Sequence, residues 1–528
     1  MNKVQVLDCT LRDGGYCNNW DFGLQNARTI THSLVEANVE IIECGFLTQL
    51  SAGPDLDSTK FATFQEVSRI IPEERNGKLF VAMINFGEYD IEDIPEHQEG
   101  FIDGVRVAFH KKNMHQALDL CQKIMSKGYL VFVQPMVSLS YSDEEFISLI
   151  KSVNEFNPYA FYIVDSFGMM KAKDLIRLFY MIEHNLNESV WIGFHSHNNM
   201  QLAYSNAQAL VNIQTNRDII IDSSIMGMGR GAGNLNTELF VDFLNENLSK
   251  DYIITPLLYV IDKILTAFYE RNYWGYSLPN YISALHNAHP NYAGYLDLKK
   301  TLTFEDMNEI FNMMHDEDKK SSYDKNYIED LYLKYQEKDR VLIERLNDFK
   351  EQVYGKRVLI VASGRTSVTE KDKVMSYAGQ PDVVTVSVNK DFNASVTDYI
   401  FISNLRRFRD ISADERKKSI VTSNISATGV FLQVRYKDLL NSHDLVKDNA
   451  ALMLIKFLIS QGVQKILLAG LDGYYVNEDQ AYSNQMINSY FEYEIAKKKN
   501  AGVTDVLKEL HSSVDIQFIT TPKYITLG

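Results

Sequence analysis

Short apolar runs alternate with amphipathic segments along the first half of the chain. Eight runs rich in Val, Ile and Phe have the length of strands that are covered on both faces: Val4–Leu7, Val39–Cys44, Leu79–Ile84, Gly104–Ala108, Leu130–Gln134, Ala160–Val164, Val190–Phe194 and Ile219–Ser223. Helical periodicity lies between them, as in Gln116–Met125, Asp143–Asn154 and Asp174–Asn185. One-way alternation predicts parallel strands with right-handed crossovers. Eight such units favour a closed (β/α)8 barrel, with an open doubly wound sheet as the alternative.

The pattern changes twice after the barrel. From about Tyr252 to Lys350 it is helical and rich in aromatic residues, and Met314–Asp339 is charged, which is typical of a solvated helix and linker. Strand patterns then resume at Arg357–Ala362, Val383–Val388, Tyr399–Ser403, Ser419–Ser423, Lys465–Ala469 and Asp515–Thr520, with a helical run at Ala450–Ser460. We therefore predict an α/β chain of three parts: a TIM barrel at 1–250, a helical extension and linker at 251–350, and a Rossmann-like α/β domain at 351–528.

Composition narrows the class of protein. The chain has 528 residues, more than one compact domain holds, and 45% of them are hydrophobic. Its net charge of −16 argues against a protein that coats nucleic acid or docks on an anionic membrane. No apolar run approaches the roughly 18 residues of a membrane span, and the chain enters a strand pattern at once, so we expect a cytoplasmic protein. The four cysteines form no C-x-x-C pair and are expected to be reduced.

Potential metal ligands follow three of the predicted strands. Asp13 follows the first, His195-x-His197 ends the seventh, and Asn234 lies beyond the eighth. Strands 1, 7 and 8 are neighbours in a closed barrel, and residues two apart on a strand face the same way, so these side chains can meet at the catalytic rim. Two imidazoles, a carboxylate and an amide suit Mn²⁺, Mg²⁺, Co²⁺ or Zn²⁺. The same ligand types also serve non-haem iron oxygenases, although not usually on a parallel barrel.

Three motifs resemble a known superfamily. They are Asp8-Cys9-Thr10-Leu11-Arg12-Asp13-Gly14, His195-Ser196-His197 and Gly227-Met228-Gly229-Arg230-Gly231-Ala232-Gly233-Asn234. Over about residues 1–302 the chain resembles the DRE-TIM metallolyases, such as 4-hydroxy-2-oxovalerate aldolase, 3-hydroxy-3-methylglutaryl-CoA lyase and isopropylmalate synthase. The resemblance implies that Asp13, His195 and His197 bind a divalent metal, chiefly Mn²⁺ or Mg²⁺, with Asn234 near it. It also implies that Arg12 hydrogen-bonds the carbonyl or enolate oxygen of the substrate.

Further side chains are expected at the barrel mouth. Glu43 ends the second predicted strand and Asp165 follows the sixth, and the resemblance makes both of them pocket residues. Either of them could also be a buried pair that supports the barrel. Weaker candidates share a position at or just past a strand end: Cys44, Asn85, His110 and Gln134.

Tyr16 departs from the family pattern. In the aldolases, a histidine three residues after the metal aspartate serves as general base, and this chain has Tyr16 there. A tyrosine with a pKa near 10 is a poor base at neutral pH unless a cation lowers that pKa. His286 and His289, in the aromatic segment after the barrel, are possible replacements, and Tyr16 could instead protonate an enolate or bind substrate. Helix capping before Pro290 is the plainer interpretation of the two histidines.

Two glycine-containing turns follow strand patterns in the second domain. Ser363 and Gly364 follow the first, and Gly470 and Asp472 lie in a later Gly-Leu-Asp-Gly turn. Such turns can present backbone amides to a phosphate, but the G-x-G-x-x-G pattern of dinucleotide sites is absent. The pair faintly resembles the Rossmann-like domain of pterin diphosphokinase-like and bacterial sialyltransferase-like proteins, which implies a nucleotide or nucleotide-sugar ligand. Arg406, Arg407 and Arg409 could contact phosphates or simply solvate a helix.

The combined prediction is a divalent-metal-dependent aldolase or lyase of the class II type that acts through a pyruvate-like enolate. Its partner would be a small 2-oxo acid or a sugar-derived substrate, and we expect a homo-oligomer. Two alternatives remain open: a Claisen-type synthase that uses an acyl-CoA, and a barrel scaffold that has lost catalysis.

Overall fold

The computed structural model describes residues 3–50, 57–336, 345–474 and 493–526. These residues form two compact units, one of Met1–Asn291 with Lys320–Tyr323 and the other of Tyr292–Lys319 with Asp324–Gly528. The predicted division into three parts stays a prediction, and the end of its linker, at residues 337–344, lies outside the described residues. None of the described helices combines the length and hydropathy that crossing a bilayer requires.

The first unit contains a closed ring of eight parallel strands. They are β1 (Val4–Asp8), β2 (Ile41–Leu47), β4 (Leu79–Asn85), β5 (Gly104–Phe109), β6 (Leu130–Pro135), β7 (Ala160–Asp165), β8 (Trp191–Ser196) and β9 (Ile219–Ser223). Each pairs with the next in this order, and β1 closes the ring by pairing with both β2 and β9. A short ninth strand, β3 (Lys60–Phe61), adds to β2. The predicted barrel is confirmed, and the open-sheet alternative is wrong.

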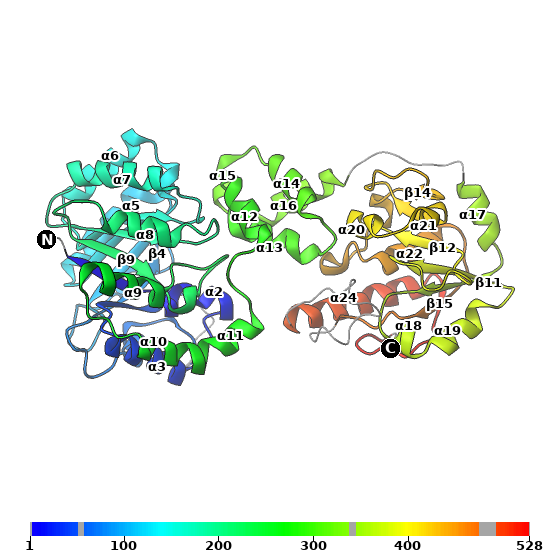
Figure 1. The fold of residues 1–528 in the computed structure, drawn as a ribbon, viewed down its shortest axis with the longest axis horizontal. Coiled ribbons are helices and arrows are strands. Elements are labelled where there is room, and N and C mark those ends of the chain that lie inside the picture. Colours follow the sequence, from blue (N-terminus) through cyan, green and yellow to red (C-terminus); the bar gives the residue numbers. More distant parts are fainter. Residues whose placement is uncertain (1–2, 51–56, 337–344, 475–492, 527–528) are drawn as a thin grey trace. The chain divides into compact units, whose positions relative to one another are not determined.

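Helices surround this ring (Figure 1). The principal ones are α3 (Leu24–Glu36), α5 (Met114–Ser126), α6 (Asp143–Asn154), α7 (Ala172–Asn185), α8 (Ala203–Val211) and α9 (Thr237–Leu248). They bury apolar stripes against the strands, as the 3.6-residue periodicity predicts. Ser142 caps α6 in a capping box with Glu145, as the sequence around it indicates. The predicted bounds of α6 are confirmed.

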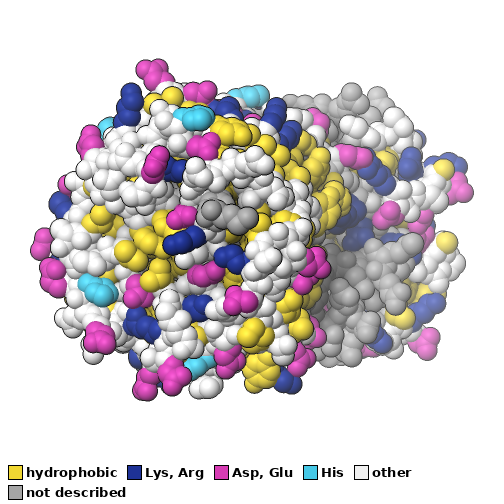
Figure 2. Space-filling view, turned by 60° about the vertical axis from the view of Figure 1, so that its left-hand side comes forward, with side chains coloured by type: hydrophobic (Ala, Val, Ile, Leu, Met, Phe, Trp, Pro, Cys, Tyr) yellow, Lys and Arg dark blue, Asp and Glu magenta, His cyan; other side chains and the backbone are white. Residues whose placement is uncertain are grey.

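Shorter helices follow α9 in the first unit: α10 (Thr255–Val260), the π-helical turn η5 (Ile261–Leu265), α11 (Thr266–Arg271) and α12 (Leu278–Leu285). On the face of this unit that Figure 2 shows, basic and acidic side chains are interspersed with apolar ones. The described side chains of that face therefore offer no continuous basic surface to a polyanion.

The second unit is built on a seven-stranded parallel sheet. Its strands are β10 (Arg357–Val361), β11 (Val383–Val388), β12 (Tyr399–Ile402), β13 (Ser419–Thr422), β14 (Leu432–Val434), β15 (Lys465–Ala469) and β16 (Asp515–Phe518). Their order is β14-β13-β12-β11-β10-β15-β16. A parallel sheet in a second domain is thus confirmed, whereas the Rossmann-like label stays a prediction. The sequence pattern missed β14, because three residues are too short to show a period.

Helices cover both faces of this sheet (Figure 1). Alternate residues of β10 separate into two cores: Val358 and Ile360 pack with α17 (Leu346–Val353), α22 (Ala450–Ser460) and α24 (Tyr493–His511). Leu359 and Val361 pack on the other side with α19 (Lys371–Ala378). The remaining described α-helices that lie wholly or partly in this unit are α13 (Pro290–Lys299), α14 (Phe304–Asn312), α15 (Glu317–Ser321), α16 (Lys325–Tyr335), α18 (Thr366–Thr369), α20 (Leu405–Arg409) and α21 (Ala413–Lys417).

Candidate metal centre and barrel mouth

Asp13, His195 and His197 come together where the strands of the barrel end. One ligand atom from each lies within 4.8 Å of the others, and all three side chains are buried. Asp13 ends the one-turn helix α1 (Thr10–Asp13) after β1, His195 lies on β8, and His197 follows β8 directly. The convergence that the strand positions predict is therefore present in the fold.

Asn234 joins this cluster from the loop after β9. Its Nδ2 donates to Asp13 Oδ2 at 2.7 Å and to the Met228 carbonyl at 3.2 Å. Its Oδ1 is buried and has no hydrogen-bond partner among the described residues, and the same is true of His197 Nδ1. Buried polar atoms left in this state are costly unless something else binds them. Two such acceptors beside a carboxylate and a second imidazole fit a divalent cation.

Asp222, on β9, orients His195. The ring Nδ1 of His195 lies 2.9 Å from Asp222 Oδ2. Burial acts to raise the pKa of Asp222, but the charge of Arg106 and the contact with His195 outweigh it, so this pKa is lowered. The ionised Asp222 carboxylate can only accept a hydrogen bond. The proton of the His195 ring therefore lies on Nδ1, and Nε2 keeps its lone pair. This is the arrangement in which a metal-binding histidine is usually held.

Electrostatics keep the other two candidate ligands in the states that bind a metal. Burial acts to raise the pKa of Asp13, but the charge of Arg12 is the largest opposing effect and this pKa is held well below its ordinary value. Burial lowers the pKa of His197 to about 3, so its ring is neutral at physiological pH. A carboxylate and neutral imidazoles are the forms that coordinate a cation.

Beneath the cluster lies a buried network of charges. Arg12 pairs through Nη1 with Asp13 Oδ1 at 2.5 Å and through Nε with Glu43 Oε2 at 2.9 Å. Arg106, on β5, pairs with the same Glu43 oxygen at 2.7 Å and also with Asp222. Three carboxylates thus face two guanidinium groups, which leaves one negative charge without a counter-charge among these five. A divalent cation would supply it.

The loops that carry these residues are tied to one another. His197 and Asn234 form an isolated antiparallel bridge, and the Asn198 N–H donates to the Gly233 carbonyl at 2.8 Å. Gly229 lies where a side chain would collide with the cluster, because an added Cβ would be 2.4 Å from Asn234 Nδ2 and 2.7 Å from Asp13 Oδ2. The glycine-rich motif therefore allows the loop to pass directly over the candidate ligands.

Tyr16 and His289 lie on either side of Arg230. The guanidinium carbon of Arg230 is 5.3 Å from the Tyr16 ring centroid, and Nη1 is 3.5 Å from His289 Nε2. The Ser166 carbonyl accepts from Arg230 Nη2 at 3.1 Å. Burial, followed by the positive charge of Arg230, lowers the pKa of His289 to about 3. The imidazole is therefore neutral at pH 7.

The remaining predicted residues have other surroundings. Asp165 accepts backbone N–H groups from Met169 and Met170, both at 3.0 Å, so it holds the loop after β7. Burial raises its pKa to about 7. His286 is the C-cap of α12. The weaker candidates are spread out: Gln134 lies against Arg106, Asn85 donates to Glu88, His110 precedes a 3₁₀ turn, and Cys44 is in the hydrophobic core.

Three charged residues of the site were not given a role by the sequence pattern. Arg106 and Asp222 interrupt otherwise apolar strands, and a charge inside a buried run is the signal that could have identified them. Arg230 is part of the glycine-rich motif, but nothing local indicated that it would lie between Tyr16 and His289. Only the closure of the ring brings these residues to Arg12 and Glu43.

In the second unit, Ser363, Gly364, Gly470 and Asp472 line a single cavity. The two turns that carry them are joined, because the Gly364 N–H donates to the Gly470 carbonyl at 2.8 Å. Arg407 lines the same cavity, whereas Arg409 pairs with Glu305. The ligand-binding role of these residues stays a prediction.

Comparisons with known proteins agree with the motifs. Residues 3–254 match the HMGL-like family model. Over 281 residues, 50% of this chain and 78% of the relative, the sequence is 28% identical to a 4-hydroxy-2-oxovalerate aldolase from Geobacillus genomosp. 3. It is 26% identical to an oxaloacetate decarboxylase from Mycobacterium tuberculosis over 241 residues, 45% of this chain and 68% of the relative.

Among solved structures, the chain is similar to the N-terminal domain of a candidate aldolase from Bacteroides vulgatus. The TM-score is 0.48 at 26% identity, and the match covers 57% of this chain and 98% of the other. Residues 3–254 are therefore similar to the HMGL-like family, and the two relatives named above are an aldolase and a decarboxylase.

Proposed function

We propose that the barrel is a divalent-metal-dependent aldolase-type lyase that cleaves or forms a carbon–carbon bond next to the ketone of a 2-oxo acid. One observation carries this proposal: Asp13, His195 and His197 offer ligand atoms within 4.8 Å of one another at a buried site. Asn234 would complete the set. When bound there, the cation would act as a Lewis acid toward the ketone and carboxylate oxygens of the substrate.

Arg12 is the residue we assign to the enolate oxygen. Its Nη1 and Nε are held by Asp13 and Glu43, while Nη2 is buried and has no hydrogen-bond partner among the described residues. A guanidinium fixed in this way keeps its charge throughout the physiological pH range. It would stabilise the negative charge that develops on the oxygen as the bond breaks, which is the kind of contact worth about 3–4 kcal/mol in other enzymes.

Tyr16, Arg230 and His289 are the groups we assign to the departing aldehyde oxygen. In aldol cleavage, the hydroxyl of the substrate loses its proton as the carbon–carbon bond breaks. The cation of Arg230 favours that alkoxide, and the Tyr16 hydroxyl and the His289 imidazole would relay the proton. Arg230 Nη1 lies 3.5 Å from His289 Nε2 and can only donate, so the neutral ring can accept the relayed proton at Nε2 only in the form that has its lone pair there.

Two reactions on the same enzyme test this assignment. Decarboxylation of oxaloacetate also forms the pyruvate enolate but involves no hydroxyl proton, whereas retro-aldol cleavage of a 4-hydroxy-2-oxo acid requires both steps.

We expect Mn²⁺-loaded enzyme to catalyse both reactions, and His195→Ala to lose bound metal and both activities. His184→Ala, on α7 away from the mouth, is the matched control. Full metal occupancy and activity in His195→Ala would refute the proposal. Release of free coenzyme A from acetyl-CoA would instead indicate the synthase alternative.

A further inference from the structure

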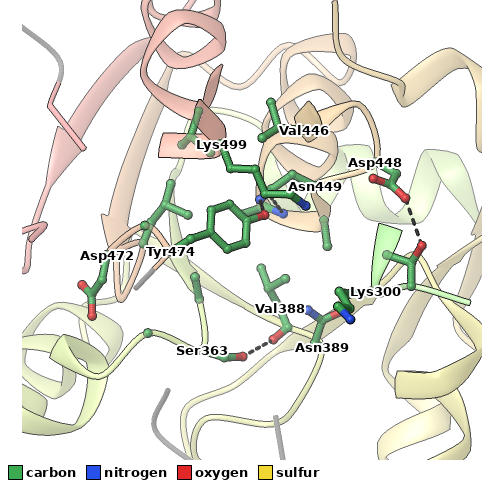
Figure 3. A pocket seen from close by; sticks show the side chains of 18 of the residues that line it. Lys300, Ser363, Val388, Asn389, Val446, Asp448, Asn449, Asp472, Tyr474 and Lys499 are labelled. Carbon is green, nitrogen blue, oxygen red and sulfur yellow. Dashed lines mark hydrogen bonds between the residues drawn. The ribbon is translucent and has the colours of Figure 1, made fainter. Parts of the chain in front are cut away.

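The cavity in the second unit lies where the strand order reverses. From β10 the chain adds β11 to β14 on one side and then returns to add β15 and β16 on the other. Ligands of parallel α/β sheets bind beyond the carboxyl ends of the strands at such a reversal. The cavity has a volume of about 150 Å³, roughly ten times the minimum that a cavity needs to hold one water. It is bordered by the residues that follow β10, β11 and β15 (Figure 3).

The glycine turns close one side of this cavity but do not offer it an anion site. Asp472 accepts the Thr366 N–H at 2.8 Å, so the first amide of the four-residue helix α18 is already bound. Gly364 has no room for a side chain, since an added Cβ would lie 2.2 Å from the Gly470 carbonyl oxygen. These residues hold the two turns together, and an anion must be bound by other groups.

Lysine side chains supply positive charge on another side. Lys299 and Lys300 end the segment from α13, and Lys499 comes from the middle of α24. Lys499 is only 5% exposed, and its Nζ donates to the Leu298 carbonyl at 3.2 Å. Asp448 is the carboxylate that lies among them, and it also accepts from Thr301 at 3.0 Å. Figure 3 shows Lys499, Lys300 and Asp448 around the same space.

These ammonium groups are partly compensated by the protein. Lys299 pairs with Glu329 at 3.3 Å and Lys300 with Asp297 at 2.6 Å. Burial lowers the pKa of Lys499 to about 8, because the attraction of Asp448 does not offset the loss of water and the repulsion of the other two lysines. Three carboxylates thus face the three ammonium groups, but the buried charge of Lys499 still costs free energy, which an anion in the cavity would recover.

The rest of the cavity is suited to a planar, partly polar group. Tyr474 lies across it, and its hydroxyl accepts from Asn449 Nδ2 at 2.9 Å (Figure 3). Val388 and Leu471 provide apolar surface, and Asn389 adds an amide. Aromatic and apolar walls with a few polar groups are typical of small-molecule and cofactor sites, and here they would suit a nucleobase.

We propose that this cavity binds a nucleoside diphosphate, either free or as the diphosphate portion of a nucleotide-linked sugar. The diphosphate lies among Lys299, Lys300 and Lys499, because each ammonium group can donate a charge-assisted hydrogen bond to its oxygens. The nucleoside lies toward Tyr474 and Asn449. This site shares no residue with the metal centre of the barrel. Its ligand would therefore be either a substrate of the second unit or a regulator of the enzyme.

Isothermal titration calorimetry on the full chain tests the proposal. The probes are UDP, CDP, ADP and GDP, with pyrophosphate and the matching nucleosides as partial ligands. We expect one of the diphosphates to bind with a Kd at least tenfold below that of pyrophosphate. Equal affinity for pyrophosphate would overturn the nucleoside part of the proposal, and the absence of binding by the whole panel would overturn all of it.

Two variants locate the site. Lys300→Met and Lys499→Met keep the side-chain length and remove the charge, and each should weaken binding of the diphosphate at least tenfold. Lys373→Met, on α19 at the opposite face of the sheet, should leave the Kd unchanged. Unchanged binding in Lys300→Met, whose partly exposed side chain makes misfolding a small risk, would place the ligand elsewhere and refute the site. Mn²⁺ binding and lyase activity of the same variants report separately on the barrel.

Discussion

His195 and Asp222 form a paired unit in which a carboxylate on β9 sets the ring orientation and tautomer of an imidazole on β8. Asp222 is itself held by Arg106 on β5, four strands from β9 on the opposite side of the ring, so the orientation of His195 depends on a charge across the barrel.

Asp222→Asn should weaken metal binding without removing it. The amide no longer stabilises the Nδ1–H tautomer of His195, and loss of such a partner typically costs about 10–100-fold in metal affinity. The measurement is competitive Mn²⁺ or Zn²⁺ titration with a chromophoric chelator. Asp242→Asn, on the exposed face of α9, is the control and should bind like the parent protein. Parent-like affinity in Asp222→Asn would remove this residue from the metal centre.

Arg12→Lys should bind metal normally and lose turnover. A lysine keeps the positive charge but has a single side-chain nitrogen. It cannot pair with Asp13 and Glu43 and also leave another nitrogen for the substrate, as the three nitrogens of the guanidinium can. We expect kcat for oxaloacetate decarboxylation to fall about 10²–10³-fold, as when one oxyanion donor is removed. Metal stoichiometry from atomic emission is measured in parallel. Turnover within twofold of the parent would exclude Arg12 from the chemistry.

Tyr16→Phe and His289→Asn should separate the two activities. Both variants should lose retro-aldol cleavage by about 10²-fold or more, because positioned proton transfer contributes about that amount. Both should retain decarboxylation within a few fold, since the enolate oxygen is bound by other groups. Tyr180→Phe, an exposed tyrosine on α7, is the control. Equal losses in both reactions would mean that these residues support the fold or the enolate rather than the aldehyde oxygen.

Arg106→Met should destabilise the barrel strongly. Glu43 and Asp222 would both lose a buried partner, and breaking such a pair costs about 3–5 kcal/mol. The free energy of unfolding of the first transition in urea is the quantity to measure. Arg177→Met removes an exposed pair with Asp143 and should cost no more than about 1 kcal/mol. Similar values for the two variants would contradict the importance of the buried network.

Binding of the diphosphate ligand should weaken as the pH rises above about 8. The free Lys499 loses its proton in this range, and the deprotonated amine attracts no anion, so the ligand must bring the proton back at a cost that grows with pH. Burial also lowers the pKa of Lys299, so its charge changes in the same direction. Titration calorimetry between pH 7.5 and 9.5 should show this trend in the parent and a smaller one in Lys499→Met. Affinity that is independent of pH would indicate that the lysines do not contact the anion.

The strands and the convergence of Asp13, His195 and His197 could be predicted because they depend on local patterns. A buried parallel strand shows an uninterrupted apolar run, and the closure rule for eight units then places the ends of β1, β8 and β9 side by side. Arg106 and the relation of Tyr16 to His289 could not be predicted in this way. They depend on side-chain directions across the ring and on a segment that returns to the mouth after β9, for which no local period exists.

The candidate ligands lie on both sides of the seam at which β1 meets β9. Asp13 follows the first strand of the ring, and Asn234 lies beyond its last strand. The complete set therefore exists only when the ring has closed. An ion bound by all four residues would add its binding free energy to the closed barrel alone.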